Sequence, residues 1–542
     1  GLQPVGTVNG RGQGTLPRYL LTKAGKDIAV VGDLDNPNLE RLIDLEPDLI
    51  LTGPASSDDF GVSVGTAGDV NNDGFDDVLI GVPYYDNGNV ADCGAVFVVF
   101  GRVSASFADI KLSEFVSSAV NGYKIIGAEA NDQLGFSLAV MDMNGDHGPD
   151  LFLATPTSSI PGRSSTGGAY VLFGEERAIP SSQPSSQPTS MPSSVYRNVD
   201  LSMPLSAQQV MEISGATAGD QTGTTMSSGG DVNGDGMEDI LIGLPNASPN
   251  YLNTAGAVLL LYGRTRSATI ADINVVNPFG NGVQGTWIFG AQAGGKLGFS
   301  VSSAGDTNND GIDDIVISAY KYTDNNLSGC GIVYVLYGRL GGFPSVVDLN
   351  TYSLTGNTAG YRLIGAYAGD QFGSSVGRAG DINNDGYDDI VVGANMQAST
   401  VSYGGVVYVV FGRATATEDV YVYTWAAPSA FGFRILGATA FSFCGDSVSG
   451  AGKFNGDVYD DIVIGGSGAS SGSGAAYILF GHWNALPFND IDLSALDPGA
   501  GFAINGANNG DQTGACVRSA GDVNGDGLDD ILVSAPYASV PG

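Results

Sequence analysis

Hydrophobic residues in this chain gather in short runs, and one set of these runs directly follows an acidic loop. The runs read DVLIGVP, DILIGLP, DIVISAY, DIVVGAN, DIVIGGS and DILVSAP. They are rich in Val and Ile and are bounded by Gly, Pro or Asn, a composition typical of buried β-strands. No stretch between them shows the apolar spacing of an amphipathic helix. The pattern therefore predicts an all-β chain.

Three further apolar runs accompany each of these strands. In one repeat they are GSSVGRAGD from Gly373, GGVVYVVFGR from Gly404 and FRILGA from Phe433. Four short, evenly spaced strands per repeat are typical of propeller blades. A TIM barrel or a Rossmann fold would need helices of about ten residues between the strands. The repeat therefore predicts a seven-bladed β-propeller of four-stranded blades, with an acidic loop between strands 1 and 2.

The acidic loop occurs seven times, as nine residues related to DxNxDGxDD. The copies start at Asp69, Asp142, Asp231, Asp306, Asp381, Lys453 and Asp522. Successive copies start roughly 70–90 residues apart. The longest interval contains the Ser/Pro/Gln-rich segment 180–194. The composition of that segment cannot build a core and predicts a disordered or polyproline-like insert.

Each loop has the composition of a calcium site. Oxygen-bearing side chains occupy positions 1, 3, 5 and 9, and the main-chain carbonyl of position 7 adds another oxygen. Ca²⁺ takes about 6–8 oxygen ligands at flexible geometry, whereas Zn²⁺ prefers Cys and His, and Mg²⁺ demands near-ideal octahedral geometry. An EF-hand would need flanking helices and a Glu at position 12, and strands follow here instead.

We expect about six calcium sites. Their predicted ligands are Asp69, Asn71, Asp73, Phe75 and Asp77; Asp142, Asn144, Asp146 and Asp150; Asp231, Asn233, Asp235, Met237 and Asp239; Asp306, Asn308, Asp310, Ile312 and Asp314; Asp381, Asn383, Asp385, Tyr387 and Asp389; and Asp522, Asn524, Asp526, Leu528 and Asp530. The second loop carries His147 and Pro149 and is expected to bind more weakly. The sixth carries Lys453 and Val458 and is expected to be empty.

The charge of the chain limits its partners. There are 57 acidic against 22 basic residues, a formal net charge of −35. Nucleic acid and anionic membrane surfaces are therefore poor partners. No run of about 20 apolar residues predicts a membrane span. The chain starts at Gly1 and stops at Gly542 within the repeat pattern, so we expect a mature or truncated piece.

The cysteines and the glycosylation sequons give information on whether the protein is extracellular. Cys93 and Cys330 fall at equivalent places three blades apart, whereas Cys444 and Cys516 fall in neighbouring blades, where a disulfide is an alternative to buried free thiols. Asn246 and Asn326 begin N-glycosylation triplets. Calcium sites of modest affinity suit the extracellular space, where calcium is millimolar.

The repeat resembles the FG-GAP repeat of integrin α-subunit β-propellers. The FG position is seen in Phe60-Gly61 and Phe372-Gly373, and the GAP position in Gly81-Val82-Pro83, on either side of a calcium loop. The resemblance covers about residues 49–542. It implies a propeller fold, calcium binding, a cell-surface or extracellular location and ligand binding on the face opposite the calcium loops. The chain departs from integrins in its Ser/Pro insert and its degenerate sixth loop, and lacks an inserted metal-dependent adhesion domain.

The repeat boundaries define the expected domains. Residues 54–542 form the propeller, with blades at about 54–128, 129–216, 217–290, 291–366, 367–438, 439–507 and 508–542. The last repeat stops after its second strand. Residues 1–53 supply the closing strands, a third strand near Lys26 and a fourth from Leu49; the alternative is that the missing strands lie beyond Gly542.

The sequence favours a binding protein without enzymatic activity. Only His147 and His482 are present, and no nucleophile elbow, P-loop or zinc-protease motif occurs. We expect an extracellular, calcium-stabilised adhesion or protein-interaction module, whose partner is an extracellular protein, another copy or a glycan. The alternatives are a building block of an extracellular filament, cell wall or flagellar appendage, and a carbohydrate-binding propeller. Four of the loops entering the blades (EANDQ, TAGDQ, YAGDQ, NNGDQ) repeat Asp-Gln without a repeated aromatic residue, which disfavours the last.

Overall fold

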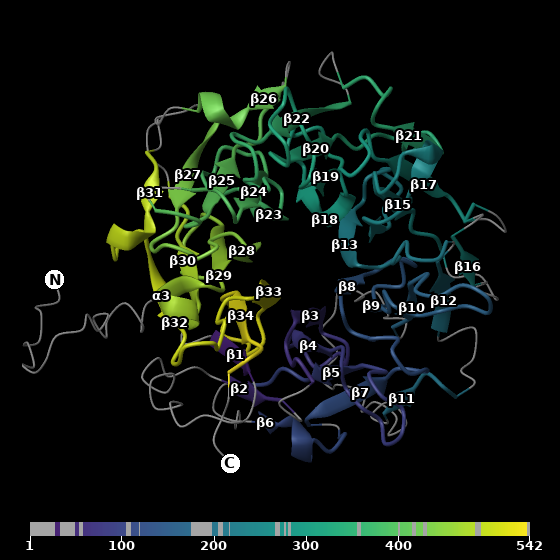
Figure 1. Cartoon of the computed structure of the whole chain (residues 1–542). Helices are drawn as coiled ribbons and strands as arrows, with labels where there is room; N and C mark the ends of the chain where they lie inside the picture. The colour runs from purple at the N-terminus through teal and green to yellow at the C-terminus, as the bar shows by residue number, and fades with distance from the viewer. Residues whose placement is uncertain are drawn as a thin grey trace, which may run out of the picture.

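Short strands dominate the computed structural model, which shows the chain as sheets arranged around a central axis (Figure 1). The residues described are 28–32, 49–53, 58–103, 110–118, 120–174, 198–203, 210–215, 217–265, 272–275, 278–279, 283–354, 359–398, 401–414, 419–425, 431–482 and 489–538. Within these ranges the α-helical part is a single four-residue helix, α3 (Ala469–Gly472). The expectation of an all-β propeller is confirmed.

Six sheets contain a regular blade of four antiparallel strands, ordered from the inside of the ring outwards. They are β3 (Ser63–Gly68), β4 (Asp77–Val82), β5 (Ala95–Val99) and β7 (Gly122–Ile126); β8 (Leu138–Met141), β9 (Asp150–Ala154), β10 (Gly168–Leu172) and β12 (Val210–Ser214); β13 (Thr225–Gly230), β14 (Asp239–Leu244), β15 (Ala257–Leu261) and β17 (Gly285–Phe289); β18 (Leu297–Gly305), β19 (Asp314–Ala319), β20 (Ile332–Leu336) and β22 (Gly360–Ile364); β23 (Ser375–Gly380), β24 (Asp389–Ala394), β25 (Val406–Val410) and β27 (Gly432–Leu436); and β28 (Ser447–Gly452), β29 (Asp461–Gly466), β30 (Ala475–Leu479) and β32 (Gly501–Asn505).

The inner strand of most blades ends in a β-bulge at the glycine that precedes the acidic loop. In the first blade the register shifts between Thr66 and Gly68, and Gly68 has φ 60°. A glycine adopts this left-handed conformation without the steric cost of a Cβ. The bulge bends the strand into the loop, so the loops begin in the same way in successive blades.

Five of the six regular blades and the seam sheet carry a fifth, outer strand, which the sequence did not predict. These strands are β6 (Ile110–Lys111), β11 (Val199–Asp200), β16 (Ile273–Asn274), β21 (Val346–Asp348), β26 (Val420–Tyr421) and β31 (Ile491–Asp492). Each lies between the third and fourth strands of one blade and pairs in parallel with the fourth strand of the preceding sheet. The overlap covers an edge that would otherwise expose unpaired backbone groups.

The seventh sheet joins the two ends of the chain and differs from a regular blade. It contains β33 (Val517–Gly521), β34 (Asp530–Ala535), β1 (Ile28–Gly32), β2 (Leu49–Thr52) and β6. β1 runs parallel to both β34 and β2. Seven equivalent antiparallel blades are therefore not observed: the structure has six regular blades and this mixed seam sheet. The four strands of a regular blade follow one another in the chain, whereas β34 and β1 come from opposite ends of it, so no direct connection fixes their relative direction.

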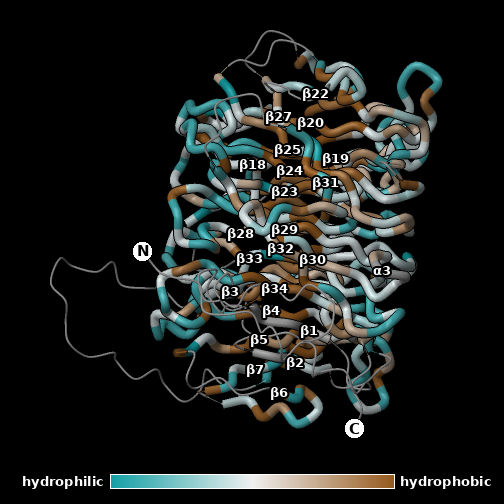
Figure 2. Tube along the Cα trace, turned by 90° about the vertical axis from the view of Figure 1, so that its left-hand side faces the viewer, coloured by the Kyte–Doolittle hydropathy of each residue, from teal (hydrophilic) through white to brown (hydrophobic). Residues whose placement is uncertain are grey.

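The hydrophobic core lies between neighbouring sheets. Alternate side chains of one strand point to opposite faces, so Leu79 packs with Leu151 of the next blade while Ile80 packs with Leu532 of the seam sheet. Figure 2 shows the hydrophobic strands as a central band, with hydrophilic loops at both faces. Among the described residues, no helix is long and apolar enough to cross a membrane.

Some sequence expectations fall on parts of the chain outside the described residues. The insert 180–194 is one of them, and most of residues 1–53 is another.

Candidate functional site

The acidic loops share a backbone shape that depends on two left-handed positions. In the first loop these are Asn72 at position 4 (φ 58°) and Gly74 at position 6 (φ 96°). Position 4 has positive φ in all seven copies and is always Asn or Gly, the residue types that tolerate this conformation. In the second loop His147 takes the place of glycine at φ 65°, whereas Val458 of the sixth loop does not adopt positive φ.

The first aspartate organises each intact loop. The carboxylate of Asp69 accepts hydrogen bonds from the N–H groups of Asp73 (3.0 Å) and Gly74 (3.0 Å). The same pair of bonds recurs in the loops that begin at Asp142, Asp231, Asp306, Asp381 and Asp522. These contacts fold the loop over the carboxylates at positions 1 and 5.

The ninth residue is a buried aspartate that accepts hydrogen bonds from backbone N–H groups. Asp77 is 0% exposed and accepts hydrogen bonds from the N–H groups of Val70 (2.9 Å) and Gly101 (2.8 Å). Burial, with the carboxylates of Asp73 and Asp69 nearby, raises its pKa to about 8. Burial is also the main reason that the pKa values of Asp150, Asp239 and Asp314 rise to about 8. A bound cation would offset this cost of burying a carboxylate.

The amide at position 3 supplies a further oxygen. The side-chain oxygens of Asn308 and Asn383 are buried and accept no hydrogen bond, an uncommon state for a buried polar atom. Within the described part of the chain, no three His, Cys, Asp or Glu side chains converge on one point. Calcium ligation therefore requires the oxygens at positions 3 and 7 as well as the carboxylates. This all-oxygen donor set fits Ca²⁺.

The sixth loop carries its own positive charge. Nζ of Lys453 lies 3.3 Å from the carbonyl oxygen of Val458 and 3.4 Å from Oδ1 of Asp460. The lysine therefore makes contacts within the loop, while the first carboxylate found in the other copies is replaced.

Position 8, which the sequence argument overlooked, links each loop to its neighbour. Oδ2 of Asp313 accepts the N–H of Asp231 (2.9 Å), and the N–H of Asp313 donates to the carbonyl of Asp231 (3.3 Å). The carboxylate bond recurs at Asp142–Glu238, Asp306–Asp388, Asp381–Asp460, Lys453–Asp529 and Asp522–Asp76. The last pair joins the C-terminal loop to the first. The acidic doublet at positions 8 and 9 was the available signal, and Pro149 interrupts it in the second loop.

The other residues singled out in the sequence lie away from these loops. All four cysteines are buried free thiols. Asn326 is exposed in a tight turn, whereas Asn246 is half-buried and hydrogen-bonded to Gln221 and Lys296. Asn326 is therefore the more accessible sequon.

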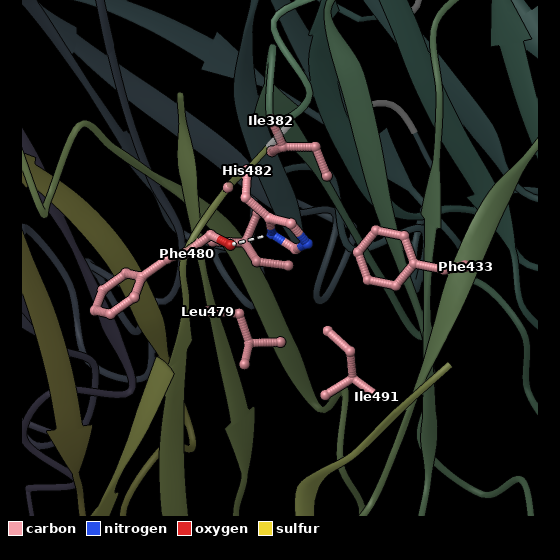
Figure 3. Close-up of a pocket in the computed structure, with 8 residues that line it drawn as sticks. Ile382, Phe433, Leu479, Phe480, His482 and Ile491 are labelled. Atoms are coloured by element: carbon pink, nitrogen blue, oxygen red, sulfur yellow. Dashed lines mark hydrogen bonds between the residues drawn. The ribbon is translucent and has the colours of Figure 1, made fainter. Parts of the chain in front are cut away.

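The two histidines occupy different surroundings. His147 lies in the second loop, with Nδ1 3.8 Å from Oδ2 of Asp142. His482 lines a pocket of about 10 Å³, which has room for about one water molecule. Phe433 and Leu479 are among its apolar lining residues (Figure 3). Nδ1 of His482 is 3.2 Å from the carbonyl oxygen of Phe480.

Comparison with known proteins identifies the repeat. The family model described as FG-GAP repeat matches residues 60–99, 222–261, 372–410 and 519–542. Each of the first three segments begins just before an inner strand and ends in the third strand of the same blade. The chain is an integrin α-like FG-GAP β-propeller.

Two kinds of curated protein are similar to this FG-GAP propeller. Integrin alpha-PS5 of Drosophila melanogaster is 28% identical over 228 residues, and integrin alpha-V of Gallus gallus is 27% identical over 258 residues. These matches cover 41% and 45% of this chain, and 20% of each integrin. Phosphatidylinositol-glycan-specific phospholipase D of Dictyostelium discoideum is 24% identical over 313 residues, which is 57% of this chain and 29% of that protein. The chain thus matches less than a third of each of these relatives.

Proposed function

We propose that this chain is a calcium-stabilised, extracellular β-propeller that acts as an adhesion or protein-interaction module. The observation that carries the proposal is the set of acidic loops, six of which repeat one donor pattern on one face of the ring. The similarity to integrin α chains supports an extracellular role in protein binding. The phospholipase relatives are matched over a minor part of their length, so their activity is not carried over.

In this proposal the chain's own residues prepare each calcium site. The aspartates at positions 1, 5 and 9, the asparagine or its equivalent at position 3 and the carbonyl of position 7 would hold the ion. Calcium would supply positive charge to a loop that buries several carboxylates. The hydrogen bonds of position 8 would then let an ordered loop in one blade stabilise the loop of the next blade. We further propose that residues 1–53 close the ring with the seven repeats of residues 54–542.

Chelation provides the first test. We expect EDTA to lower the melting temperature of the purified chain, because without the cation the carboxylates at positions 1 and 5 repel each other by about 1 kcal/mol and the carboxyl group at position 9 is buried without a compensating charge. Calcium, added back, should restore the melting temperature, and magnesium at equal concentration should restore less. An unchanged melting temperature in EDTA would contradict the calcium assignment.

The binding face provides the second test. Leu252→Thr creates an N-glycosylation triplet at Asn250, in the loop between β14 and β15 on the face opposite the acidic loops. Beads coated with the glycosylated variant should lose calcium-dependent attachment to cells of the native host. The same variant without its glycan, made in bacteria, is the matched control and should attach normally. Equal attachment by both forms would exclude this face.

A further inference from the structure

One loop of the face opposite the calcium loops departs from its counterparts. The segments entering four other sheets contain Asp-Gln at equivalent positions, as in Asp370-Gln371 and Asp511-Gln512. The segment between β27 and β28 carries Phe441-Ser442-Phe443 in the corresponding place. Ser442 thus replaces the aspartate and Phe443 the glutamine, while Phe441 stands at the position before them.

The backbone of this loop is one that large side chains rarely adopt. Phe441 has φ 60° and Phe443 has φ 50°. The residue equivalent to Phe441 is glycine in several other copies, for example Gly369 with φ 82°. A bulky residue in the left-handed region is uncommon, and such conformations gather at binding sites. The loop keeps a phenylalanine at Phe441 where glycine would fit with less strain.

Phe441 forms an exposed aromatic surface with Tyr403. Phe441 is 54% exposed and Tyr403 is 48% exposed, and their rings stack with centroids 5.5 Å apart. The backbone holds the pair in place: the N–H of Phe441 donates to the carbonyl of Ser402 (2.9 Å), and that of Phe443 donates to the carbonyl of Tyr403 (3.2 Å). The rings are therefore positioned while open to solvent.

A hollow of about 540 Å³ adjoins this surface, within the usual range for small-molecule sites. Its side-chain lining includes Thr439, Phe441, Phe443, Ser467 and Gln512, and none of its lining residues is charged. Glycines contribute exposed main chain to the rest of the wall. The described lining is thus uncharged in a chain whose net charge is −35, which favours a neutral ligand.

The lining matches the chemistry of a sugar ring. Aromatic faces pack against the C–H groups of a pyranose, while hydroxyl, amide and main-chain groups exchange hydrogen bonds with its hydroxyls. Ser467 donates its own hydroxyl hydrogen to Asp446, which leaves the Ser467 oxygen able to accept one from a ligand. We propose that this hollow binds a pyranose unit of a neutral glycan. The proposal goes beyond protein adhesion and does not depend on calcium.

Saturation-transfer NMR on the full chain tests the proposal with cellobiose, maltose, mannobiose and N,N′-diacetylchitobiose as probes. We expect at least one disaccharide to show saturation transfer. The double variant Phe441→Gly, Phe443→Gln restores residue types found in the other copies, so it should fold while weakening the binding at least ten-fold. Tyr251→Asn is the matched control, because Tyr251 is fully exposed on the same face outside the hollow.

Two results would overturn the proposal. One is the absence of saturation transfer to all four disaccharides with the wild-type chain. The other is equal binding by wild type and the double variant. If no disaccharide shows saturation transfer and a hydrophobic peptide binds at this hollow, the proposal is likewise contradicted. Because these measurements do not use chelation or cell attachment, their failure would leave the calcium and adhesion proposals standing.

Discussion

At the scale of single residues, the sixth loop is the natural test of what a calcium site needs. Lys453→Asp combined with Val458→Gly restores the first carboxylate and the residue type that tolerates positive φ. We expect calcium stoichiometry, measured by elemental analysis after gel filtration, to rise from six to seven ions per chain.

Lys453→Ala is the matched control for this gain. It removes the ammonium group without supplying a carboxylate, so the stoichiometry should stay at six. A wild-type chain that already binds seven ions would show that Lys453 does not prevent binding.

A buried aspartate on the opposite face predicts a specific pH dependence. Burial raises the pKa of Asp370 from 3.8 to about 7, against the opposing hydrogen bond from the N–H of Tyr367. Between about pH 4 and pH 7 the folded chain holds a proton that the unfolded chain has lost, so the contribution of Asp370 to stability falls as pH rises.

Asp370→Asn should remove this dependence, because a neutral amide has no charge to desolvate and keeps an acceptor for Tyr367. In urea titrations, the variant and wild type should match near pH 4, and the variant should be more stable near pH 8. Glu114→Gln, at an exposed residue, is the control. A constant difference at all pH values would contradict the assignment.

The sequence indicated which loop positions are candidate ligands, but it did not indicate which residues the loops contact. The positions proposed as ligands do follow the first strand of each blade, and position 9 is the first residue of the second strand. The roles of positions 4 and 8 were missed for different reasons. Position 4 sets backbone conformation, whereas the partner of position 8 lies about 80 residues away in another blade, as in the pair Asp231 and Asp313.

At the scale of elements, neighbouring blades are tied together by position 8, and this contact predicts a stability change. Asp313→Ala should lower the free energy of unfolding by about 1–3 kcal/mol, because the N–H of Asp231 loses its acceptor. Denaturant unfolding at fixed calcium would measure the change.

The second blade offers the reciprocal experiment. Pro149 provides neither an N–H group nor a carboxylate at position 8, so Pro149→Asp should add an acceptor for the first loop. Pro149→Ala corrects for the loss of proline from the unfolded chain, which alone costs about 0.4–1 kcal/mol. We expect the Asp variant to be more stable than the Ala variant by about 1 kcal/mol, and equal stabilities would contradict the role of this position.

The outer fifth strands were too short to be predicted from the sequence. Most are two residues long, too short for an alternating pattern to stand out. A signal was present: an Asp beside an aliphatic residue recurs in the connections, as at Asp272-Ile273 and Asp490-Ile491. Their pairing depends on the edge that the preceding blade presents.

At the scale of the whole molecule, the seam sheet determines whether the ring is closed. Val30 lies in the middle of β1, between β2 and β34. Val30→Pro removes a backbone N–H group from a central strand and should open the seam. We expect association that increases with concentration, measured by light scattering after size exclusion, since an exposed edge pairs with other chains.

Val30→Thr keeps the N–H group and a β-branched side chain, and should stay monomeric if wild type does. A monomeric, equally stable Val30→Pro variant would show that β1 is not needed for closure.

The repeat count implied that the two ends of the chain must meet, but it did not reveal the direction of the strands. Within a blade, the four main strands that follow one another in the chain pair antiparallel, even where the connection is long, as between β5 and β7. β1 reaches β34 from the other end of the chain, and the 16 residues between β1 and β2 are long enough for a parallel crossover.

The parallel pairing of β1 with β34 has a mechanical consequence. A pull on the two ends of the chain draws the start of β1 and the finish of β34 in opposite directions along the strand axes. The hydrogen bonds between them are then loaded together, in shear. Two antiparallel strands pulled apart from adjacent ends would instead open one bond at a time. A molecule tethered through both ends would therefore carry tension across its own closure, in the direction in which that closure resists most.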